Sequence, residues 1–325
     1  MTVVVDHIGV GLSRSNGTYA AYAVICFFVL SGFLITHLLL GEYDKTGDVS
    51  LRKFYTRRAL RIFPAFYGYA AVYVMGRIAM NLSIHWPSLL SCLTYTTNYY
   101  GSFHEDVPPT MVHVWSLAVE EQFYLLWPFI FWKLAGNRRG LMKGLITAVL
   151  AIWAYRWVAV IFNFSGTYVY EAFETRADAL ALGCLMAIAN RENVIPRWLL
   201  DWKWLGPVAL VMIVISAALV LNGPRYSWAL VAVAFAVLIL QAIAHAQSVW
   251  YRWLNLKPFY ALGIISYSLY LYHPFAIRLP GVLRSYVPEM IFAIALATAS
   301  YFIVEKPFLR LKGRMWNPAK AVAHS

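Results

Sequence analysis

Two adjacent glutamates, Glu120 and Glu121, stand inside the apolar stretch VHVWSLAVEEQFYLLWP at residues 112–128. His113 and Ser116 precede Glu120 at helical spacing, so these three residues share one face of a helix. Glu121 points about 100° away from Glu120. Carboxylates on such a helix either serve proton transfer beside a histidine or join helices by hydrogen bonds, and the second role suits Glu121 better than Glu120.

A second group with chemical potential is the arginine cluster in RKFYTRRALRIFP at residues 52–64. Arg58 and Arg61 lie one turn apart on a helix, and two fixed guanidiniums suit bidentate binding of phosphate. The alternative is a positive anchor at the cytoplasmic membrane surface, which accounts well for Lys53 and Arg57. It accounts poorly for Arg61, which lies one turn further along the apolar run.

Further ionisable residues lie in other apolar runs, where by default they indicate function. His7 lies near the start of the chain. Arg176 and Asp178 in TRADALALG are two residues apart, so they face different directions and are expected to pair with other helices. His273 in SYSLYLYHPF is a candidate substrate contact, a packing histidine or an interfacial residue.

The amino-acid composition predicts which kind of secondary-structure element holds these residues. Of 325 residues, 61% are hydrophobic and only 13% are charged, which predicts an all-α, polytopic integral membrane bundle. About ten transmembrane helices are predicted, at residues 1–13, 18–40, 55–80, 113–134, 144–163, 173–190, 204–222, 226–246, 258–279 and 287–305.

The basic residues fix the predicted orientation. Most of the 27 Lys and Arg gather in alternate loops, so both chain termini are expected in the cytoplasm, and the net charge of +12 does not indicate nucleic-acid binding. The apolar stretch at 88–100 is expected to be re-entrant or interfacial, because an eleventh crossing would move the later basic loops outside. Three cysteines in apolar runs lack metal-ligand spacing, and no metal site or bound cofactor is indicated.

The first predicted span is short. Thirteen residues from Met1 make about 20 Å of helix, whereas a crossing needs about 30 Å. No charged segment and cleavage site typical of a signal peptide are present. Either the chain starts within the membrane, or the sequence begins downstream of the true start.

Taken in order, the motifs resemble those of the membrane-bound acyltransferase family 3. They are CFFVLSGFLIT after a histidine-bearing first span, FYTRRALRIFP, HVWSLAVEEQFYLLWP, TRADALALG, SYSLYLYHPF and SYFIVEKPFLRL. The resemblance extends over residues 7 to about 310, which predicts one transmembrane acyltransferase domain at 1–310 followed by a short basic cytoplasmic tail at 311–325.

The resemblance implies an O-acyltransferase of the inner (plasma) membrane. It would move an acyl group, with acetyl expected, from cytoplasmic acyl-CoA to a hydroxyl of a cell-surface carbohydrate or lipid-linked glycan. His7 corresponds to the family's catalytic histidine, and Arg58 and Arg61 to an RxxR pair associated with acyl-CoA. The other matching positions are Glu120 and Glu121, Arg176 and Asp178, and Glu305 with Pro307.

We further expect Glu120 to orient His7, with His7 acting as a base or as an acyl-accepting nucleophile. One departure from the family is that its first helix carries an arginine about three turns before the histidine, whereas only six residues precede His7. The start is then misplaced, or this member has lost part of its site. The competing interpretation is a proton-coupled transporter or exporter of a surface glycan or small solute, in which the same residues form a proton relay.

Overall fold

A computed structural model describes residues 18–222, 228–248, 252, 255–277 and 286–316. The described part of the chain is helical and contains no strand, which confirms the all-α prediction. The long helices are α2 (Thr18–Thr46), α3 (Leu51–Ala79), α6 (Val114–Leu134), α7 (Arg138–Ile161), α9 (Phe173–Arg191), α11 (Leu205–Asn222), α12 (Trp228–Ala244), α14 (Lys257–Ala276) and α15 (Tyr286–Ser300). Short helices connect them, namely α4 (Trp86–Leu93), α5 (Thr97–Phe103), α8 (Gly166–Glu171) and α10 (Arg197–Leu200).

Each predicted span from 18–40 onward coincides with one of these long helices. The predicted span at 1–13, with His7, lies outside the described residues. The largest shift of a helix start is at α7, which begins at Arg138 rather than at residue 144 because Asn137 caps the helix by accepting a hydrogen bond from the Gly140 amide. Three of the long helices end in a left-handed asparagine, since Asn81, Asn163 and Asn193 adopt φ of 53° at the position after the C-cap residue.

The stretch at 88–100 forms the short helices α4 and α5, which are separated by a turn. The eight residues of α4 make about 12 Å of helix, well below the thickness of a bilayer. This stretch therefore supplies no eleventh membrane span.

Helices α2 and α9 approach each other most closely at two glycines. A Cβ atom added at Gly32 would lie 2.0 Å from the carbonyl oxygen of Leu180, and one added at Gly183 would lie 2.1 Å from that of Val29. Small residues at such a crossing let two helix backbones touch, which is a usual way of packing helices in membranes. The contact fixes where the middle of α2 lies, including the neighbouring Ser31.

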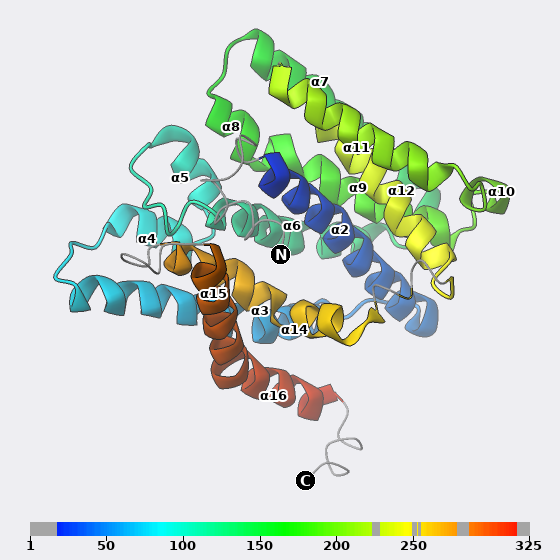
Figure 1. Cartoon of the computed structure of the whole chain (residues 1–325). Coiled ribbons are helices and arrows are strands. Elements are labelled where there is room, and N and C mark those ends of the chain that lie inside the picture. The colour runs from blue at the N-terminus through cyan, green and yellow to red at the C-terminus, as the bar shows by residue number, and fades with distance from the viewer. Residues whose placement is uncertain (1–17, 223–227, 249–251, 253–254, 278–285, 317–325) are drawn as a thin grey trace.

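Helix α6 lies between two parts of the hydrophobic core. Trp115, Val119 and Phe123 pack with α2, α7, α9 and α12. Val114 and Leu117 pack with α3, α4 and α14. In Figure 1, α7, α9, α11 and α12 lie above and to the right of α2, whereas α3, α14 and α15 lie below it. Polar residues on α6 are therefore held between the two halves of the bundle.

Large apolar side chains also cover the outside of the described bundle, as expected where helices face lipid. Three helical segments are long and apolar enough to cross a membrane by length and composition, at Ala20–Thr46, Arg138–Ile161 and Val287–Leu311. Shorter apolar helices run over Leu205–Ala217 and Trp228–Ala244.

The last described helices run on without a break. A π-helical turn, η5 (Tyr301–Glu305), joins α15 to α16 (Lys306–Trp316), so the predicted tail at 311–325 begins inside a helix. Pro307 follows directly after the π turn, which accommodates the proline without ending the helix. The π turn places Glu305 in the core, as π turns often do near functional residues.

Candidate functional site

The polar stripe predicted on α6 is buried along its whole length. His113, Ser116 and Glu120 are each 4% exposed, and Tyr124 continues the same face one turn later with the same exposure. His113 occupies the N-cap position, so it stands at the start of the helix rather than within it. We refer to this start as the His113 end of the bundle.

Glu120 is the centre of the stripe. Its carboxylate accepts hydrogen bonds from the hydroxyls of Ser31 on α2 and Tyr124 on α6. The Tyr124 hydroxyl also lies 3.1 Å from the Ser31 oxygen. Glu120 therefore joins α6 to α2, a helix-joining contact that the sequence pattern favoured for Glu121.

Arg58 lies beside this centre. Its guanidinium lies 4.3 Å from the centre of the Tyr124 ring, within the range of a cation–π contact. The charge of Arg58 also acts on Glu120 and Glu121. Glu121 is half-buried on a different face of α6, as predicted from its position, and its charge acts on Tyr95 of the α4–α5 turn.

The two arginines of the RxxR pair have different surroundings. Arg58 is half-buried and faces α6, whereas Arg61 is exposed and its charge acts on the buried Glu305. The carboxylate of Glu305 accepts a hydrogen bond from the Ser268 hydroxyl of α14, and the Ser268 oxygen lies 2.9 Å from the Ser300 oxygen. Arg58 thus contacts α6 through Tyr124, whereas the charge of Arg61 acts on both Glu305 of η5 and Glu120 of α6.

At the His113 end, the structure brings together residues that the sequence treats separately. The rings of His113 and His273 lie 5.1 Å apart between centres and nearly perpendicular, and both residues are buried. The hydroxyl of Tyr270 on α14 donates to the His113 carbonyl oxygen at 2.7 Å and lies 2.5 Å from the Ser116 oxygen. Tyr69 of α3 contacts the His113 ring edge-on.

Arg176 and Asp178 do not pair with each other. Asp178 forms a buried ion pair with Arg156 of α7 at 2.8 Å and accepts a hydrogen bond from the indole of Trp153 at 2.9 Å. The guanidinium of Arg176 lies over the rings of Trp115, Tyr170 and Trp228, at 4.7 to 5.6 Å from their centres. Both residues therefore contact other helices, as their spacing predicts.

Glu171 lies on the short helix α8, near Arg176. Its side chain is buried, although the residue lies outside the predicted spans. Burial raises the pKa of Glu171 to about 8, and the charge of Arg176 opposes that rise. A carboxyl that stays partly protonated near neutral pH is unusual on a connecting segment. It adds a titratable group near the His113 end.

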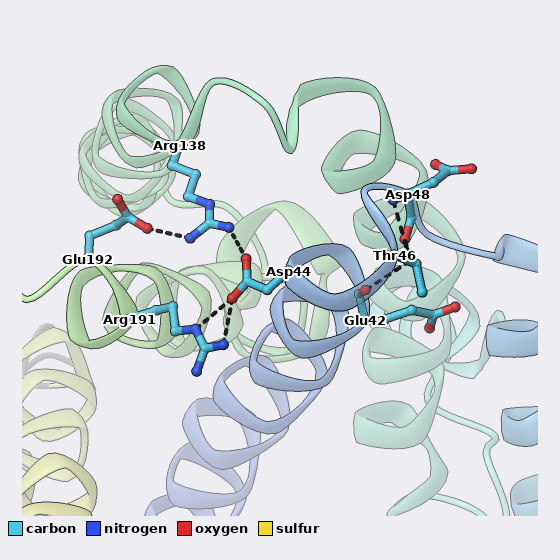
Figure 2. A network of polar contacts seen from close by, with 7 residues as sticks. All are labelled: Glu42, Asp44, Thr46, Asp48, Arg138, Arg191 and Glu192. Atoms are coloured by element: carbon cyan, nitrogen blue, oxygen red, sulfur yellow. Dashed lines mark hydrogen bonds and ion pairs between the residues drawn. The ribbon is translucent and has the colours of Figure 1, made fainter.

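A very different set of charges lies at the opposite end of α2, the Asp44 end. Asp44 pairs with Arg138 and with Arg191, whose closest approach is 2.6 Å, and Arg138 also pairs with Glu192 (Figure 2). The indole of Trp132, near the end of α6, donates to Asp48 just beyond α2, which places the end of α6 here.

A shallow open pocket of about 440 Å³ adjoins this network and is lined in part by Tyr43, Asn137 and Arg138. The guanidinium of Arg138 already contacts two carboxylates, and the exposed Arg139 also lines the pocket. Arg57 is likewise paired, with Glu42 at 3.1 Å.

Several contacts of the candidate site were missed by sequence reasoning. Tyr124 could have been found, since it follows Glu120 by one helical turn. Ser31, Tyr270 and Arg156 lie on other helices, and only the fold shows that they reach the stripe or Asp178. His7 lies outside the described residues, and no group of three metal-ligating side chains occurs within them.

Comparison with known proteins adds the family. A family model described as an acyltransferase domain matches residues 1–304. The peptidoglycan O-acetyltransferase OatA of Listeria monocytogenes is 31% identical over 319 residues, which cover 87% of this chain and 49% of the relative. The O-acetyltransferase OatA of Staphylococcus aureus is 27% identical over 319 residues, which cover 88% of this chain and 52% of the relative.

The chain thus spans about half the length of these curated relatives. No solved structure matches it. The match over residues 1–304 includes every motif up to Val304, from the histidine of the first predicted span to the start of the terminal helix. The chain therefore belongs to this acyltransferase family.

Proposed function

We propose that the chain is the membrane domain of an O-acyltransferase that moves an acetyl group from cytoplasmic acyl-CoA to a hydroxyl of a cell-surface carbohydrate. The observation that carries the proposal is that Glu120 and Arg58, from two motifs far apart in the chain, both contact Tyr124. The Tyr124 hydroxyl donates to the buried Glu120 carboxylate, and the Arg58 guanidinium lies 4.3 Å from the centre of the Tyr124 ring. A buried carboxylate and an arginine that share one tyrosine in an apolar interior are typical of a functional site.

The proposed topology is about ten crossings with both termini in the cytoplasm. The Asp44 end is then the inner end of the bundle and the His113 end the outer end. Residues 1–310 form one domain, and the tail after it is basic. Support comes from the agreement of the long helices with the predicted spans and from the basic residues at the Asp44 end.

The donor is proposed to bind at the inner end. Arg58 and Arg61 lie in the first turns of α3, where guanidiniums could bind the phosphates of acyl-CoA. Arg61 is the exposed member of the pair and would meet the donor first. No resident metal or cofactor has a part in this scheme.

The chemistry needs one proton transfer at each substrate. The acceptor hydroxyl loses its proton as its oxygen forms a bond to the acyl carbon, and the carbon–sulfur bond to CoA breaks. The departing thiolate then gains a proton. We propose that the base is His7, because an imidazole ordinarily titrates near neutral pH. We propose that Glu120 orients His7.

The acceptor class follows from the relatives. One of them is named as a peptidoglycan O-acetyltransferase, so a hydroxyl of a cell-wall glycan is the acceptor that we propose here. The membrane-facing apolar exterior would place the domain beside a polymer assembled at the cell surface.

The test is release of free CoA thiol from acetyl-CoA by membranes that contain the protein, with a soluble peptidoglycan fragment as acceptor. His7→Ala should abolish release without loss of folded protein, because no base remains. The matched control is His37→Ala, which changes an exposed histidine of α2. Full activity of His7→Ala would remove His7 from the mechanism, and no thiol release by the unmodified protein would favour transport instead.

The donor site has its own test. The double variant Arg58→Ala with Arg61→Ala should raise the KM for acetyl-CoA at least tenfold and change that for the acceptor much less. Arg77→Ala, at the other end of α3, is the matched control, because its guanidinium donates to the carbonyl oxygen of Ser83 in the loop after the helix. Equal effects on both substrates would contradict a donor site.

A further inference from the structure

Among the arginine, lysine and carboxylate side chains of the described bundle, that of Arg176 is the most deeply buried, at 2% exposed. Its Nε and Nη2 atoms are buried and have no hydrogen-bond partner among the described residues. Buried donors are normally paired, because an unpaired donor loses its hydrogen bonds to water and gains none in return. The two nitrogens of Arg176 therefore indicate a partner that binds from outside the chain.

The two unpaired nitrogens also define the shape of that partner. Nε and Nη2 lie on the same edge of the planar guanidinium, so their N–H bonds point in nearly the same direction. Two parallel donors match the two oxygens of a carboxylate, which arginine binds in a bidentate manner. A single hydroxyl oxygen would pair only one of them well. The unpaired edge of Arg176 is thus the kind of site that binds a carboxylate.

The acidic residues nearby do not occupy this site. Asp178 forms an ion pair with Arg156 at 2.8 Å, so the charges of these two residues balance each other. Burial raises the pKa of Glu171 to about 8 against the opposing charge of Arg176, which leaves most of this carboxyl protonated at neutral pH. No carboxylate within the described residues forms an ion pair or a hydrogen bond with the two nitrogens. The positive charge of Arg176 is therefore largely uncompensated.

Three aromatic rings surround the guanidinium and hold it in place. The rings of Trp115 on α6, Tyr170 on α8 and Trp228 on α12 have their centres 4.7 to 5.6 Å from the Arg176 Cζ atom. The Tyr170 ring also contacts the other two, at 4.9 and 5.3 Å between centres. Such rings stabilise a positive charge, but they do not replace an acceptor for two in-plane N–H groups. The rings thus fix the guanidinium and leave its unpaired edge for a ligand.

Arg176 and the three rings, which we call the Arg176 cluster, lie toward the His113 end of the bundle. The last residue of α9, Arg191, belongs to the ion network at the Asp44 end, whereas Arg176 stands near the start of this helix (Figure 2). Tyr170 is only half-buried, and residues 161–167 before it are exposed. Helix α8 therefore separates the Arg176 cluster from the surface at which, in the proposed topology, the acceptor arrives.

We propose that Arg176 binds a carboxylate of the acceptor, so that the acceptor is an acidic glycan whose sugars carry carboxylate groups. Arg176 holds the acceptor from its outer side and takes no part in bond formation, so His7 keeps the role of base. The acetyl group still passes directly from the CoA sulfur to the acceptor oxygen. This inference rests on the proposed function and narrows its substrate class.

The test is the binding of a soluble peptidoglycan fragment to the purified protein in detergent, measured by calorimetry at neutral pH without acetyl-CoA. The fragment is used in two forms, one with its carboxylates free and one with its carboxylates converted to amides. The unmodified protein should bind the free form at least about tenfold more tightly, as expected for a bidentate ion pair. Arg176→Gln should remove this preference by raising the Kd of the free form, with little change in the Kd of the amide form.

Three further variants make the test decisive. Arg176→Lys keeps the charge but lacks two parallel donors, so it should lose most of the preference, and it replaces Arg176→Gln if that variant fails to fold. Glu171→Gln removes a negative charge that acts on Arg176 and should not weaken binding of the free form. Arg77→Gln removes an equal charge at the end of α3 and should keep the preference, which excludes a general attraction by positive charge.

The outcomes distinguish this inference from the proposed function. Equal affinities for the two forms in the unmodified protein, or an unchanged preference in Arg176→Gln, would overturn the carboxylate site, whereas acceptor-dependent thiol release would still support the acyltransferase. A preference that depends on Arg176, found in a protein that releases no thiol from acetyl-CoA, would support the carboxylate site and overturn the proposed transfer.

Discussion

The stripe on α6 and the ion network at the Asp44 end both join α2 to its neighbours, by opposite means. In the stripe, the single carboxylate of Glu120 accepts hydrogen bonds from two hydroxyls in the interior, and one arginine lies nearby. The network holds two arginines and two carboxylates whose side chains are 20% to 44% exposed (Figure 2). The network contains more charged groups, whereas the stripe contains polar groups that have few partners in an apolar interior.

This difference shows that a count of charges does not locate the chemistry. Exposed ion pairs are screened by water and salt, and they balance one another. A buried carboxylate has few partners, so each partner determines its protonation and reactivity. This contrast predicts effects of different size when the two sites are changed.

The largest effect is expected where α2 is fixed against α9. Gly32→Ala places a Cβ atom against the Leu180 carbonyl, so α2 must move and take Ser31 away from Glu120. We expect a loss of about 3 kcal/mol in the free energy of unfolding. The measurement is the midpoint of thermal unfolding in detergent.

The matched control for that variant lies in the same helix. Gly41 has open space where a Cβ atom would stand, so Gly41→Ala should leave the midpoint unchanged or raise it slightly. Equal midpoints for the two variants would contradict a close α2–α9 contact.

Removal of the central carboxylate comes next. Glu120→Ala leaves the hydroxyls of Ser31 and Tyr124 without their shared acceptor in the interior. The expected loss is about 2 kcal/mol, and it should not depend on salt because the site is buried. A loss that disappears in 0.5 M salt would show that water reaches the stripe.

Asp44→Asn should have a smaller effect, which sharpens the contrast. It removes the charge between Arg138 and Arg191, but both guanidiniums remain open to water. We expect about 1 kcal/mol at low ionic strength, decreasing toward zero in roughly 0.5 M salt. Chemical unfolding at the two salt concentrations measures this loss of unfolding free energy. A loss that does not depend on salt would show that the network is shielded from water as the stripe is.

The smallest effect is expected in the loop at the His113 end. The Tyr100 hydroxyl and the charge of His85 hold the pKa of Asp106 below its usual range, with His85 at 3.1 Å. A lowered carboxyl pKa stabilises the folded loop above the ordinary value of about 4, and this contribution is lost as the pH falls through the folded value.

Pepsin cleavage near Phe103 can detect this difference. Asp106→Asn should be cleaved faster than the unmodified protein at pH 5, and the difference should shrink as the pH is lowered to 2, because Asp106 of the unmodified protein becomes protonated. A difference that persists at pH 2 would assign the effect to packing of the loop rather than to ionisation.

Much of the fold was predictable because membrane helices reveal themselves by length and hydropathy. The spans from 18–40 onward coincide with helices for that reason. The pairing of α2 with α9 was not predictable, since Gly32 and Gly183 gain meaning only when the two helices meet. Likewise, the helix continues past Glu305 because a π turn accommodates Pro307, and no sequence pattern indicates that turn.

The candidate site was predictable along one helix and unpredictable across helices. Helical periodicity places His113, Ser116 and Glu120 on one face, and they are buried together. The same reasoning could not give Ser31 as the partner of Glu120, or join His113 to His273, because these contacts depend on tertiary packing. The roles of the individual residues, His7 included, stay predictions.

One comparison tests most directly whether the reaction uses the stripe. Acceptor-dependent thiol release from acetyl-CoA should be measured for Glu120→Gln and Asp44→Asn in membranes, at equal amounts of folded protein. We predict that Glu120→Gln loses about 100-fold or more, as expected for loss of a group that supports proton transfer, whereas Asp44→Asn keeps most of its rate. Full activity of Glu120→Gln, or an equal loss in Asp44→Asn, would contradict a catalytic role for the stripe.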